Sequence, residues 1–324
     1  MMLVHRDLEQ LPAFHNAVIT IGTFDGVHVG HQQIINQLKT TAAAVGGTSV
    51  IITFHPHPRA IVGNYGGQVA LLNTLDEKIA LLNQAGIDHL VVVPFTEKFA
   101  SLTAEEYCIQ FLQHYFKPHT IIIGYDHRFG KNRSGDYHLL EKMGKTLGFA
   151  VKEINEKVLH DITISSTQIR TALHAHKIEI ANQFLGYAYT FEGVVIKGNQ
   201  LGRTIGYPTA NIQVNNSDKL IPADGVYAVT VKLRPINEYR EPITDIWYAG
   251  MMNIGLRPTV DGKKRVIEVN IFDFDNDIYG STLQIHVHAF LRTEVKFSGL
   301  DALVTQLEGD AVKAKEQLAE LLGG

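Results

Sequence analysis

Near residue 186 the sequence changes from alternating strand-like and helix-like segments to segments that are almost all strand-like. Before it, short β-branched runs alternate with segments of helical periodicity; the runs lie at residues 17–22, 48–54, 89–95 and 119–124. Repeated strand–helix–strand units predict a parallel sheet with right-handed crossovers, and continuous apolar runs suit strands buried on both faces. The first part of the chain is therefore predicted to be an α/β domain.

Helices are expected between and after these runs. The first follows His31 and ends at Gly46-Gly47, a pair suited to a helix C-terminus. The others are expected at residues 76–85, 103–116 and about 167–185.

Beyond residue 186 the chain is rich in strands. Gly, Pro, Asp and Asn turns separate five β-rich stretches, at residues 189–198, 225–233, 245–255, 265–274 and 281–291. Short strands without helices between them predict a closed or nearly closed antiparallel barrel, and a last helix at about 300–321 would pack against it. We therefore expect two domains, residues 1–185 and 186–324.

Composition limits the classes of protein to which the chain can belong. With 45% hydrophobic and 19% charged residues it has the composition of an ordinary globular protein. The net charge of −4 lacks the basic footprint typical of nucleic-acid binding. Cys108 is the single cysteine, and neither a signal core nor an apolar run long enough for a bilayer is seen. These features predict a cytoplasmic protein with no membrane or nucleic-acid partner.

The decapeptide "GTFDGVHVGH", residues 22–31, stands between the first predicted strand and helix. Its glycines allow tight turns and close approach of the backbone to a ligand, and a helix N-terminus favours an anion. His28 and His31 would add donors to the same phosphates and stabilise charge in a transition state. Two alternatives stay open: half of a metal site that His55 and His57 complete, and a purely structural loop.

Three further stretches lie where the same site is expected, at strand ends or a helix start. They are "TFHPHPR" (53–59), "IIIGYDHRFGKNRSGD" (121–136) and "ISSTQIR" (164–170). The candidate site residues in them are His57, Arg59, Asp126, Arg128, Ser165, Ser166, Thr167 and Arg170, of which the basic side chains and the hydroxyls suit a substrate anion. For "ISSTQIR" the alternative is an ordinary helix N-cap, and for Arg128 it is a surface ion pair.

In the second half, "GRTIGYPTAN" (202–211) contains two neutral oxygen donors, Thr209 and Asn211. Pro208 fixes the backbone before them, and their spacing of two lets both side chains point the same way on an extended segment. Such ligands beside phosphates suit Mg²⁺, and the alternative is a simple turn. Glu268, among apolar strand residues, is a candidate base for an attacking alcohol, or an exposed strand residue.

With these motifs in this order, the first half resembles the HxGH nucleotidyltransferases, in which such a histidine pair contacts ATP phosphates. Through "GRTIGYPTAN", "DGVYAV", "GMMNIGLRPTV", "EVNIFDFDNDIYG" and "FLRTEVKF", the second half closely resembles the riboflavin kinase module. Joined, they are similar to the bacterial bifunctional riboflavin kinase and FAD synthetase family from about residue 17 to about 310.

The resemblance implies a Rossmann-like nucleotidyltransferase domain followed by a β-barrel kinase domain with a terminal helix. The barrel would phosphorylate riboflavin with ATP and Mg²⁺, and the first domain would join FMN to AMP and release pyrophosphate. It implies catalytic roles for Glu268, His28, His31 and Arg170, with Thr209 and Asn211 at the metal. The other substrate-binding residues would be Gly22, Phe24, Asp25, Gly30, His57, Arg59, Asp126, Arg128, Ser165, Ser166, Thr167, Gly202, Arg203, Pro208, Asn253 and Arg292.

Several points depart from the family pattern or stay open. Asn270 stands where many relatives have His, and His127 where many have an aromatic residue. Arg292 lies near the flavin in the family, and its alternative role is to support the terminal helix. Competing functions are a nucleotidyltransferase whose barrel only binds flavin, and a nucleic-acid-binding barrel. The expected partners are ATP, riboflavin and FMN, and the expected state is a monomer or weak homo-oligomer.

Overall fold

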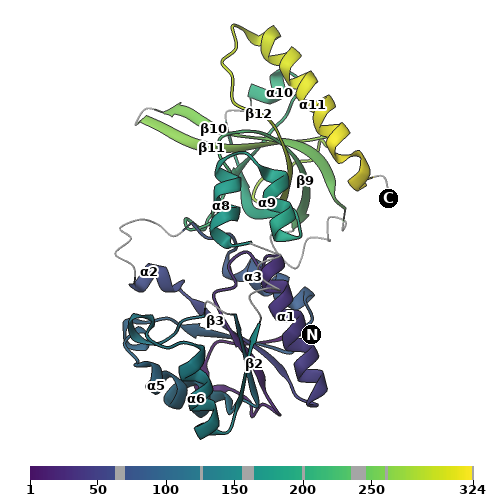
Figure 1. Cartoon of the computed structure of the whole chain (residues 1–324). Helices are drawn as coiled ribbons and strands as arrows, with labels where there is room; N and C mark the ends of the chain where they lie inside the picture. The colour runs from purple at the N-terminus through teal and green to yellow at the C-terminus, as the bar shows by residue number, and fades with distance from the viewer. Residues whose placement is uncertain are drawn as a thin grey trace. The chain divides into compact units, whose positions relative to one another are not determined.

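The computed structural model describes residues 1–62, 70–124, 127–154, 164–198, 201–234, 246–259 and 262–322 (Figure 1). Asp126 lies outside the described residues. The chain divides into two compact units, Met1–Ser166 and Thr167–Gly324, and each is considered by itself below.

The first unit is built on a six-stranded parallel sheet, as the apolar runs predict. Its strands lie side by side in the order β1-β4-β3-β2-β5-β6. They are β1 (Leu3–His5), β2 (Val18–Ile21), β3 (Ser49–His55), β4 (His89–Pro94), β5 (Thr120–Gly124) and β6 (Ala150–Ile154). The central strands β2 to β5 are almost wholly buried, which explains their uninterrupted β-branched sequences.

Helices cover both faces of this sheet. On one face α1 (Val29–Ala44) and α3 (Leu75–Gln84) bury Ile35, Leu38 and Leu82. On the other face α5 (Ala104–Glu106), the π-helix η2 (Tyr107–Phe116) and α6 (Tyr137–Leu147) enclose a core rich in aromatic residues. The shorter helices are η1 (Leu8–Gln10), α2 (Pro58–Val62), α4 (Glu97–Ala100) and η3 (Lys131–Arg133).

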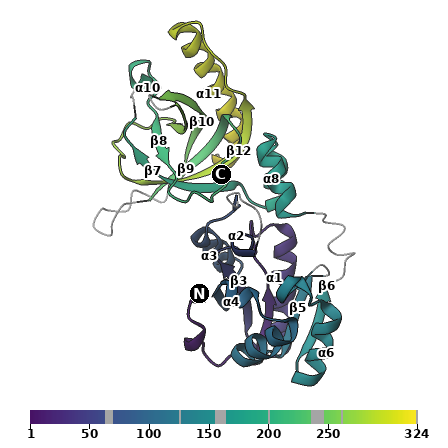
Figure 2. The same cartoon turned by 90° about the vertical axis from the view of Figure 1, so that its left-hand side faces the viewer.

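The second unit holds a closed six-stranded antiparallel barrel, in the order β10-β11-β8-β7-β12-β9. Its strands are β7 (Tyr189–Ile196), β8 (Ala210–Gln213), β9 (Gly225–Arg234), β10 (Tyr248–Thr259), β11 (Gly262–Ile271) and β12 (Thr282–Arg292). Its helices are α8 (Ser166–His174), which starts at the last residue of the first unit, α9 (Ile178–Leu185), α10 (Leu201–Thr204) and α11 (Leu300–Leu322). Figure 2 shows the strands closing on themselves with α11 along one side.

Two helices anchor to the outside of the barrel. α11 buries Ala314 and Leu318 against Ala228 and Met251. In α9, the Asn182 side-chain amide donates to the Val287 carbonyl at 2.9 Å and its oxygen accepts from the Tyr189 amide at 2.8 Å. Because α9 packs on the barrel in this way, it belongs to the second compact unit, which begins at Thr167. The expected domain boundary was at residues 185–186. A functional boundary near residue 185 stays a prediction.

The predicted elements and the structure agree at the buried positions and differ at the edges. The sequence does not predict β1, β6 and β8 as strands. Each has only three to five residues, and exposed positions interrupt each of them, so none contains the apolar run that identifies a buried strand. The helix expected over 103–116 is one α-helical turn that continues as a π-helix.

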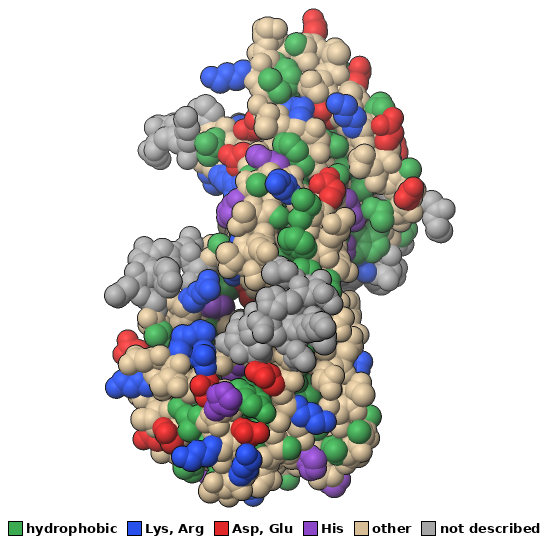
Figure 3. All heavy atoms as spheres, viewed as in Figure 1, with side chains coloured by type: hydrophobic (Ala, Val, Ile, Leu, Met, Phe, Trp, Pro, Cys, Tyr) green, Lys and Arg blue, Asp and Glu red, His purple; other side chains and the backbone are tan. Residues whose placement is uncertain are grey.

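Within the part of the chain that the structure describes, no helix combines the length and apolarity needed to cross a membrane. Acidic and basic side chains are interspersed on the face shown in Figure 3.

Candidate active sites

The loop from β2 to α1 takes an unusual backbone path. Phe24, Gly26 and Val27 have φ angles of 47°, 91° and 38°, in the left-handed region that favours glycine. A phenylalanine and a valine in this region cost free energy, so the surrounding structure must hold the loop in place.

Buried hydrogen bonds provide that hold. One Asp25 carboxylate oxygen accepts from the backbone amides of Leu72 and Asn73, at 3.0 and 3.3 Å. The Ser166 hydroxyl donates to the Asp25 carbonyl at 2.8 Å. Asp25 is 2% exposed, so these bonds are shielded from water and fix the loop before helix α1 begins.

The two histidines meet at the start of α1. His28 is the N-cap, and its ring nitrogen Nδ1 accepts from the His31 amide at 3.4 Å. The rings stack with centroids 3.7 Å apart, and Phe24 packs 5.0 Å from the His31 ring. A Cβ on Gly30 would lie 3.2 Å from the His28 ring, so this glycine leaves room for the stack. The structure therefore brings together four residues predicted from the decapeptide.

Burial determines the charge of this pair. Loss of hydration lowers the pKa of His28 to about 4, although the nearby Asp25 carboxylate opposes the shift. Burial also lowers the pKa of His31, and the positive charges of His28 and Lys78 lower it further. Both imidazoles are therefore neutral at neutral pH, and each offers one ring N–H as a donor.

Lys78 is a member of this site that the sequence reasoning missed. It lies on α3, is 6% exposed, and donates to the Thr23 carbonyl in the decapeptide loop at 2.6 Å. Burial lowers the pKa of Lys78 to about 8, and Asp25 acts against the shift. The available signal was a lysine within the apolar stripe of a helix, since Leu75, Ile79 and Leu82 flank it on the same face.

The other predicted residues of the first half are less closely placed. The His57 ring accepts from the Arg59 amide at 3.1 Å, and Arg59 is exposed on α2. Arg128 forms an exposed ion pair with Asp136 at 3.3 Å, the alternative role considered for it. Three more predicted residues lie at or near the start of α8: Ser165 and Thr167, both exposed, and the half-buried Arg170. Gly22, at the end of β2, donates its amide to Ile52 at 3.0 Å.

Among the residues that the structure describes, no group of three or more His, Cys, Asp or Glu side chains is arranged to hold a metal ion. His55 is exposed at the end of β3, and His57 follows it beyond the strand. The rings of His28 and His31 stack against each other, with centroids 3.7 Å apart.

In the barrel, strand register aligns three of the predicted residues. Asn253 of β10 lies directly opposite Glu268 of β11, and Glu268 lies directly opposite Asn211 of β8. Residues paired in this way share one face of the sheet, so the three side chains form a polar row across neighbouring strands. The carboxylate of Glu268 is therefore on the polar side, as its sequence context predicts.

Two further charged residues, which the sequence reasoning did not select, contact this row. Arg257 forms ion pairs of 2.9 Å with both Glu268 and Glu294. Asn253 also donates to Glu294, at 3.2 Å. Both missed residues lie in quoted motifs, and Arg257 has the same strand parity as Asn253, which is the signal that would have linked them.

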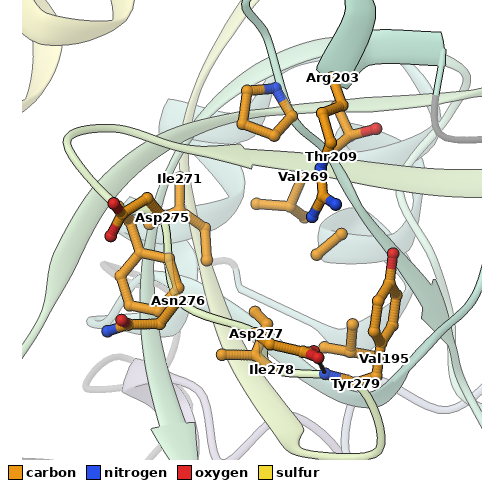
Figure 4. A pocket seen from close by; sticks show the side chains of 13 residues that line it. Val195, Arg203, Thr209, Val269, Ile271, Asp275, Asn276, Asp277, Ile278 and Tyr279 are labelled. Atoms are coloured by element: carbon orange, nitrogen blue, oxygen red, sulfur yellow. Dashed lines mark hydrogen bonds between the residues drawn. The ribbon is translucent and has the colours of Figure 1, made fainter.

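A pocket of about 420 Å³ is lined by residues of β7, β8 and β11 and of the loops around them. Its walls are polar and apolar in about equal measure, and its polar residues include Arg203, Thr209 and Asp277. In Figure 4, Arg203 and Thr209 enter from one side and face Asp277 and Tyr279 across the cavity. The Asp277 carboxylate accepts from the Tyr279 amide at 3.1 Å, which shapes the loop that forms this wall.

Strand alternation separates the pocket from the polar row. Ala210 and Val269 line the pocket, whereas their chain neighbours Asn211 and Glu268 do not. Thr209 lines the pocket and stands two residues before Asn211, just before strand β8 begins.

Glycine and amide groups fix the "GRTIGYPTAN" segment. A Cβ on Gly202 would lie 2.1 Å from the Tyr207 carbonyl, so only glycine permits this turn. Asn270 is 7% exposed and donates to the Pro208 carbonyl at 2.8 Å. The departure from the family pattern at residue 270 is thus a structural support of this loop.

Arg292 contacts the terminal helix. Its guanidinium donates to both carboxylate oxygens of Asp310 on α11, at 2.7 to 3.0 Å, and Asp310 is fully buried. The guanidinium thus makes the helix-supporting contact considered for it above, and a contact with flavin stays a prediction.

Family models match the two halves in turn. The model for FAD synthetase matches residues 11–168, and the model for riboflavin kinase matches residues 185–318. The first match contains the histidine loop, and the second contains the polar row and the pocket.

Relatives match over nearly the whole chain. The chain is 39% identical to the bifunctional riboflavin kinase/FMN adenylyltransferase of Listeria monocytogenes, over 94% of each chain. It is 37% identical to the enzyme of the same name from Bacillus subtilis, over 94% of this chain and 93% of that one. A crystal structure titled Macrolide-efflux Protein, from Streptococcus pneumoniae, is similar with a TM-score of 0.84 at 30% identity, covering 97% of this chain and 98% of that one. This chain belongs to the family of bifunctional riboflavin kinase/FMN adenylyltransferases.

Proposed function

We propose that this chain makes FAD from riboflavin in two ATP-dependent steps, one in each half. The second half transfers the γ-phosphoryl group of ATP to the 5′-hydroxyl of riboflavin, which gives FMN and ADP. The first half transfers AMP from a second ATP to the FMN phosphate, which gives FAD and pyrophosphate. The two consecutive family matches support this division of labour.

In the kinase half, Glu268 is the base. Its carboxylate takes the proton of the riboflavin hydroxyl as that oxygen attacks the γ-phosphorus and ADP leaves. The pocket of about 420 Å³ is of a size for the adenosine part of ATP, and Thr209 in its wall is two residues from Asn211, the cross-strand partner of Glu268.

The oxygen atoms of Thr209 and Asn211 are suited to Mg²⁺, which takes few protein ligands when phosphates supply the rest. A Cβ on Gly198 would lie 2.2 Å from the Asn211 amide, so the backbone closely encloses one of the two side chains. When bound there, Mg²⁺ would neutralise charge on the transferred phosphoryl group.

In the adenylyltransferase half, the FMN phosphate is already ionised and needs no base. Its oxygen attacks the α-phosphorus of ATP, and pyrophosphate leaves. His28 and His31 donate hydrogen bonds to the phosphates, and the α1 N-terminus adds its amide groups and partial positive charge. Ser165, Ser166, Thr167 and Arg170 are further phosphate-binding candidates. The stacked histidine pair at this helix start is the observation that carries the assignment.

The test follows both products in one reaction. Purified protein is incubated with riboflavin, ATP and Mg²⁺, and FMN and FAD are separated by chromatography. The His31→Ala variant is expected to accumulate FMN, with FAD formation reduced about a hundredfold or more, a loss comparable to removing one oxyanion donor. The Glu268→Ala variant is expected to lose FMN formation and still convert added FMN to FAD.

Each variant thus serves as the other's folding control. Equal loss of both activities in both variants would contradict separate sites. Formation of FAD from FMN without any phosphorylation of riboflavin by the unmodified protein would leave the barrel as a flavin-binding module. The cytoplasmic location, and the monomeric or weakly oligomeric state, stay predictions from the sequence.

A further inference from the structure

One loop of the barrel, residues 202–209, supplies two of the polar side chains in the pocket wall. They are Arg203 and Thr209, which enter the cavity from the same side (Figure 4). The loop ends where β8 begins, and the pairing of β8 with β7 and β11 starts only at Ala210. Strand pairing therefore leaves the loop itself to be held by other contacts.

The loop is closed on itself by hydrogen bonds to one carbonyl. The Gly202 carbonyl accepts from the amides of Tyr207 and Ile205, at 2.8 and 3.2 Å. This compact turn places Arg203 between its two ends. The positions of Arg203 and Thr209 in the pocket therefore depend on where the end of the turn is attached to the rest of the barrel.

Asn270 on β11 provides one attachment. Its side-chain amide donates to the Pro208 carbonyl at 2.8 Å, and the residue is 7% exposed. Its chain neighbours Val269 and Ile271 line the pocket, so Asn270 itself points to the other face of the strand. There it lies directly opposite Met251, a buried apolar residue. A buried amide is costly without a partner, so this position favours keeping the bond to the loop.

The preceding residue, Tyr207, provides the other attachment. Its side chain packs on the apolar cluster between the barrel and α11, whose buried members include Met251, Ala314 and Leu318. Burial raises the pKa of Tyr207, and the nearby Glu308 carboxylate on α11 raises it further. Consecutive residues of the loop are thus attached to different elements, Tyr207 to the face covered by α11 and Pro208 to β11.

We propose that Asn270 and Tyr207 are positioning residues for ATP in riboflavin phosphorylation, because they attach the 202–209 loop so that Arg203 and Thr209 are in place before the nucleotide binds. The inference rests on the proposed binding of the adenosine part of ATP in this pocket. A wall that is already ordered costs less conformational entropy when the ligand binds. Loss of either attachment should therefore weaken the use of ATP and leave riboflavin and the chemical step little changed.

The experiment measures initial rates of riboflavin phosphorylation by the full-length chain, as the sum of FMN and FAD, with ATP and riboflavin varied separately. Asn270→Leu has a side chain of similar size without the donor. We expect it to raise KM for ATP about five- to tenfold, the effect of one hydrogen bond, with KM for riboflavin within about twofold and kcat within about threefold. Asn270→His offers a ring N–H in place of the amide and should bring KM for ATP back to within about threefold.

A second pair of variants tests the other attachment. Tyr207→Ala removes the ring from the apolar cluster and is expected to raise KM for ATP by a similar factor. Tyr207→Phe keeps the ring and should stay within about twofold of the unmodified protein. If Asn270→Leu does not fold, the difference between these two variants decides the question: equal KM values for ATP would overturn the proposal.

Asn182→Leu is the matched control. The Asn182 amide also donates to a barrel carbonyl, that of Val287 at 2.9 Å, but it does so from α9 and Asn182 is not among the residues that line the pocket. The control is expected to leave KM for ATP unchanged. Urea unfolding, followed by Trp247 fluorescence, compares the stability lost in the two variants. An equal rise of KM in Asn182→Leu would mean that general loosening of the barrel explains the effect, and would overturn the proposal.

The outcomes separate this inference from the proposed function. If the unmodified protein does not phosphorylate riboflavin, the proposed function fails. If it does, and Asn270→Leu leaves KM for ATP in place or raises KM for riboflavin just as much, the positioning role is overturned and the kinase assignment stands.

Discussion

At the scale of single residues, burial decides how the histidine loop can act on phosphates. His28 and His31 are neutral at neutral pH because hydration is lost, so they give directional hydrogen bonds instead of full charges. Lys78 supplies a positive charge at this loop, where its ammonium group donates to the Thr23 carbonyl. A buried cation behind the loop makes it more favourable for a polyphosphate to lie in front of it.

Lys78→Met tests that cation. We expect kcat/KM for FMN adenylylation to fall about tenfold, equivalent to about 1.4 kcal/mol, because both the loop anchor and the charge are lost. Since burial lowers the pKa of Lys78 to about 8, adenylylation by the unmodified protein should decline above that pH. The Lys78→Met profile should be flatter in the same range. Both are measured by FAD formation from added FMN.

The matched control is Lys145→Met, because Lys145 is 74% exposed and pairs with Glu141 on α6. It is expected to keep the adenylylation rate. Riboflavin phosphorylation reports on the other half of the chain and should be unchanged in both variants. An adenylylation profile that is identical in Lys78→Met and the unmodified protein would show that Lys78 only fills space.

Among the helices and strands, α11 is attached to the barrel by one buried charge in addition to its apolar contacts. Asp310 is fully buried and is bonded by Arg292 and by the Gln306 amide at 2.9 Å. Arg292 is only 18% exposed, so the pair is well shielded from solvent. A buried carboxylate that loses its partner is costly, because neither water nor another cation replaces the guanidinium.

Arg292→Leu should therefore destabilise the second unit by about 3 kcal/mol. Urea unfolding is followed by the fluorescence of Trp247, the single tryptophan, which lies just before β10. The double variant Arg292→Leu/Asp310→Asn removes the stranded charge and should recover at least half of the loss. If Arg292→Leu unfolds at the same urea concentration as the unmodified protein, the pair does not hold the helix, and a role at the flavin becomes the better account.

At the scale of the whole molecule, both units carry buried histidines that resist protonation. Besides His28 and His31 in the first unit, burial lowers the pKa of His286 and of His288 in the barrel to about 4. Positive charges on His288, Arg234 and Lys232 lower the pKa of His286 further. His286 packs 4.2 Å from the Trp247 ring, and His288 bonds the Thr230 hydroxyl at 2.8 Å. In the unfolded chain these groups titrate near 6.5.

The folded state therefore binds fewer protons than the unfolded state between about pH 6.5 and pH 4. The free energy of unfolding should fall as the pH is lowered through this window, by at most about 1.4 kcal/mol per pH unit for each of these histidines. Circular dichroism in urea reports both units, and Trp247 fluorescence reports the second alone. His286→Gln/His288→Gln should flatten the dependence seen by fluorescence, whereas the exposed His174→Gln should not. A dependence that survives in the double variant would assign the acid sensitivity to other groups.

The fold follows from the sequence wherever a segment is buried. β2 to β5 and the long barrel strands bury most or alternate residues, so their apolar periodicity predicts them. β1, β6 and β8 are short, and exposed residues interrupt their burial, so no periodic pattern identifies them. The motifs likewise predict the two sites, since glycine, histidine and threonine at fixed spacings imply specific backbone and phosphate chemistry.

The two-part architecture, the histidine loop at a helix N-terminus and the polar positions of the barrel strand that carries Glu268 can therefore be predicted from sequence alone. The partners of the charged side chains become known only from the folded chain: Lys78 with the Thr23 carbonyl, Arg257 with Glu268 and Glu294, and Arg292 with Asp310. The physical reason is the separation in sequence between the residues that interact. Periodicity and capping act between residues a few positions apart, whereas ion pairs and buried hydrogen bonds join residues from separate segments, and their partners are set by register and packing.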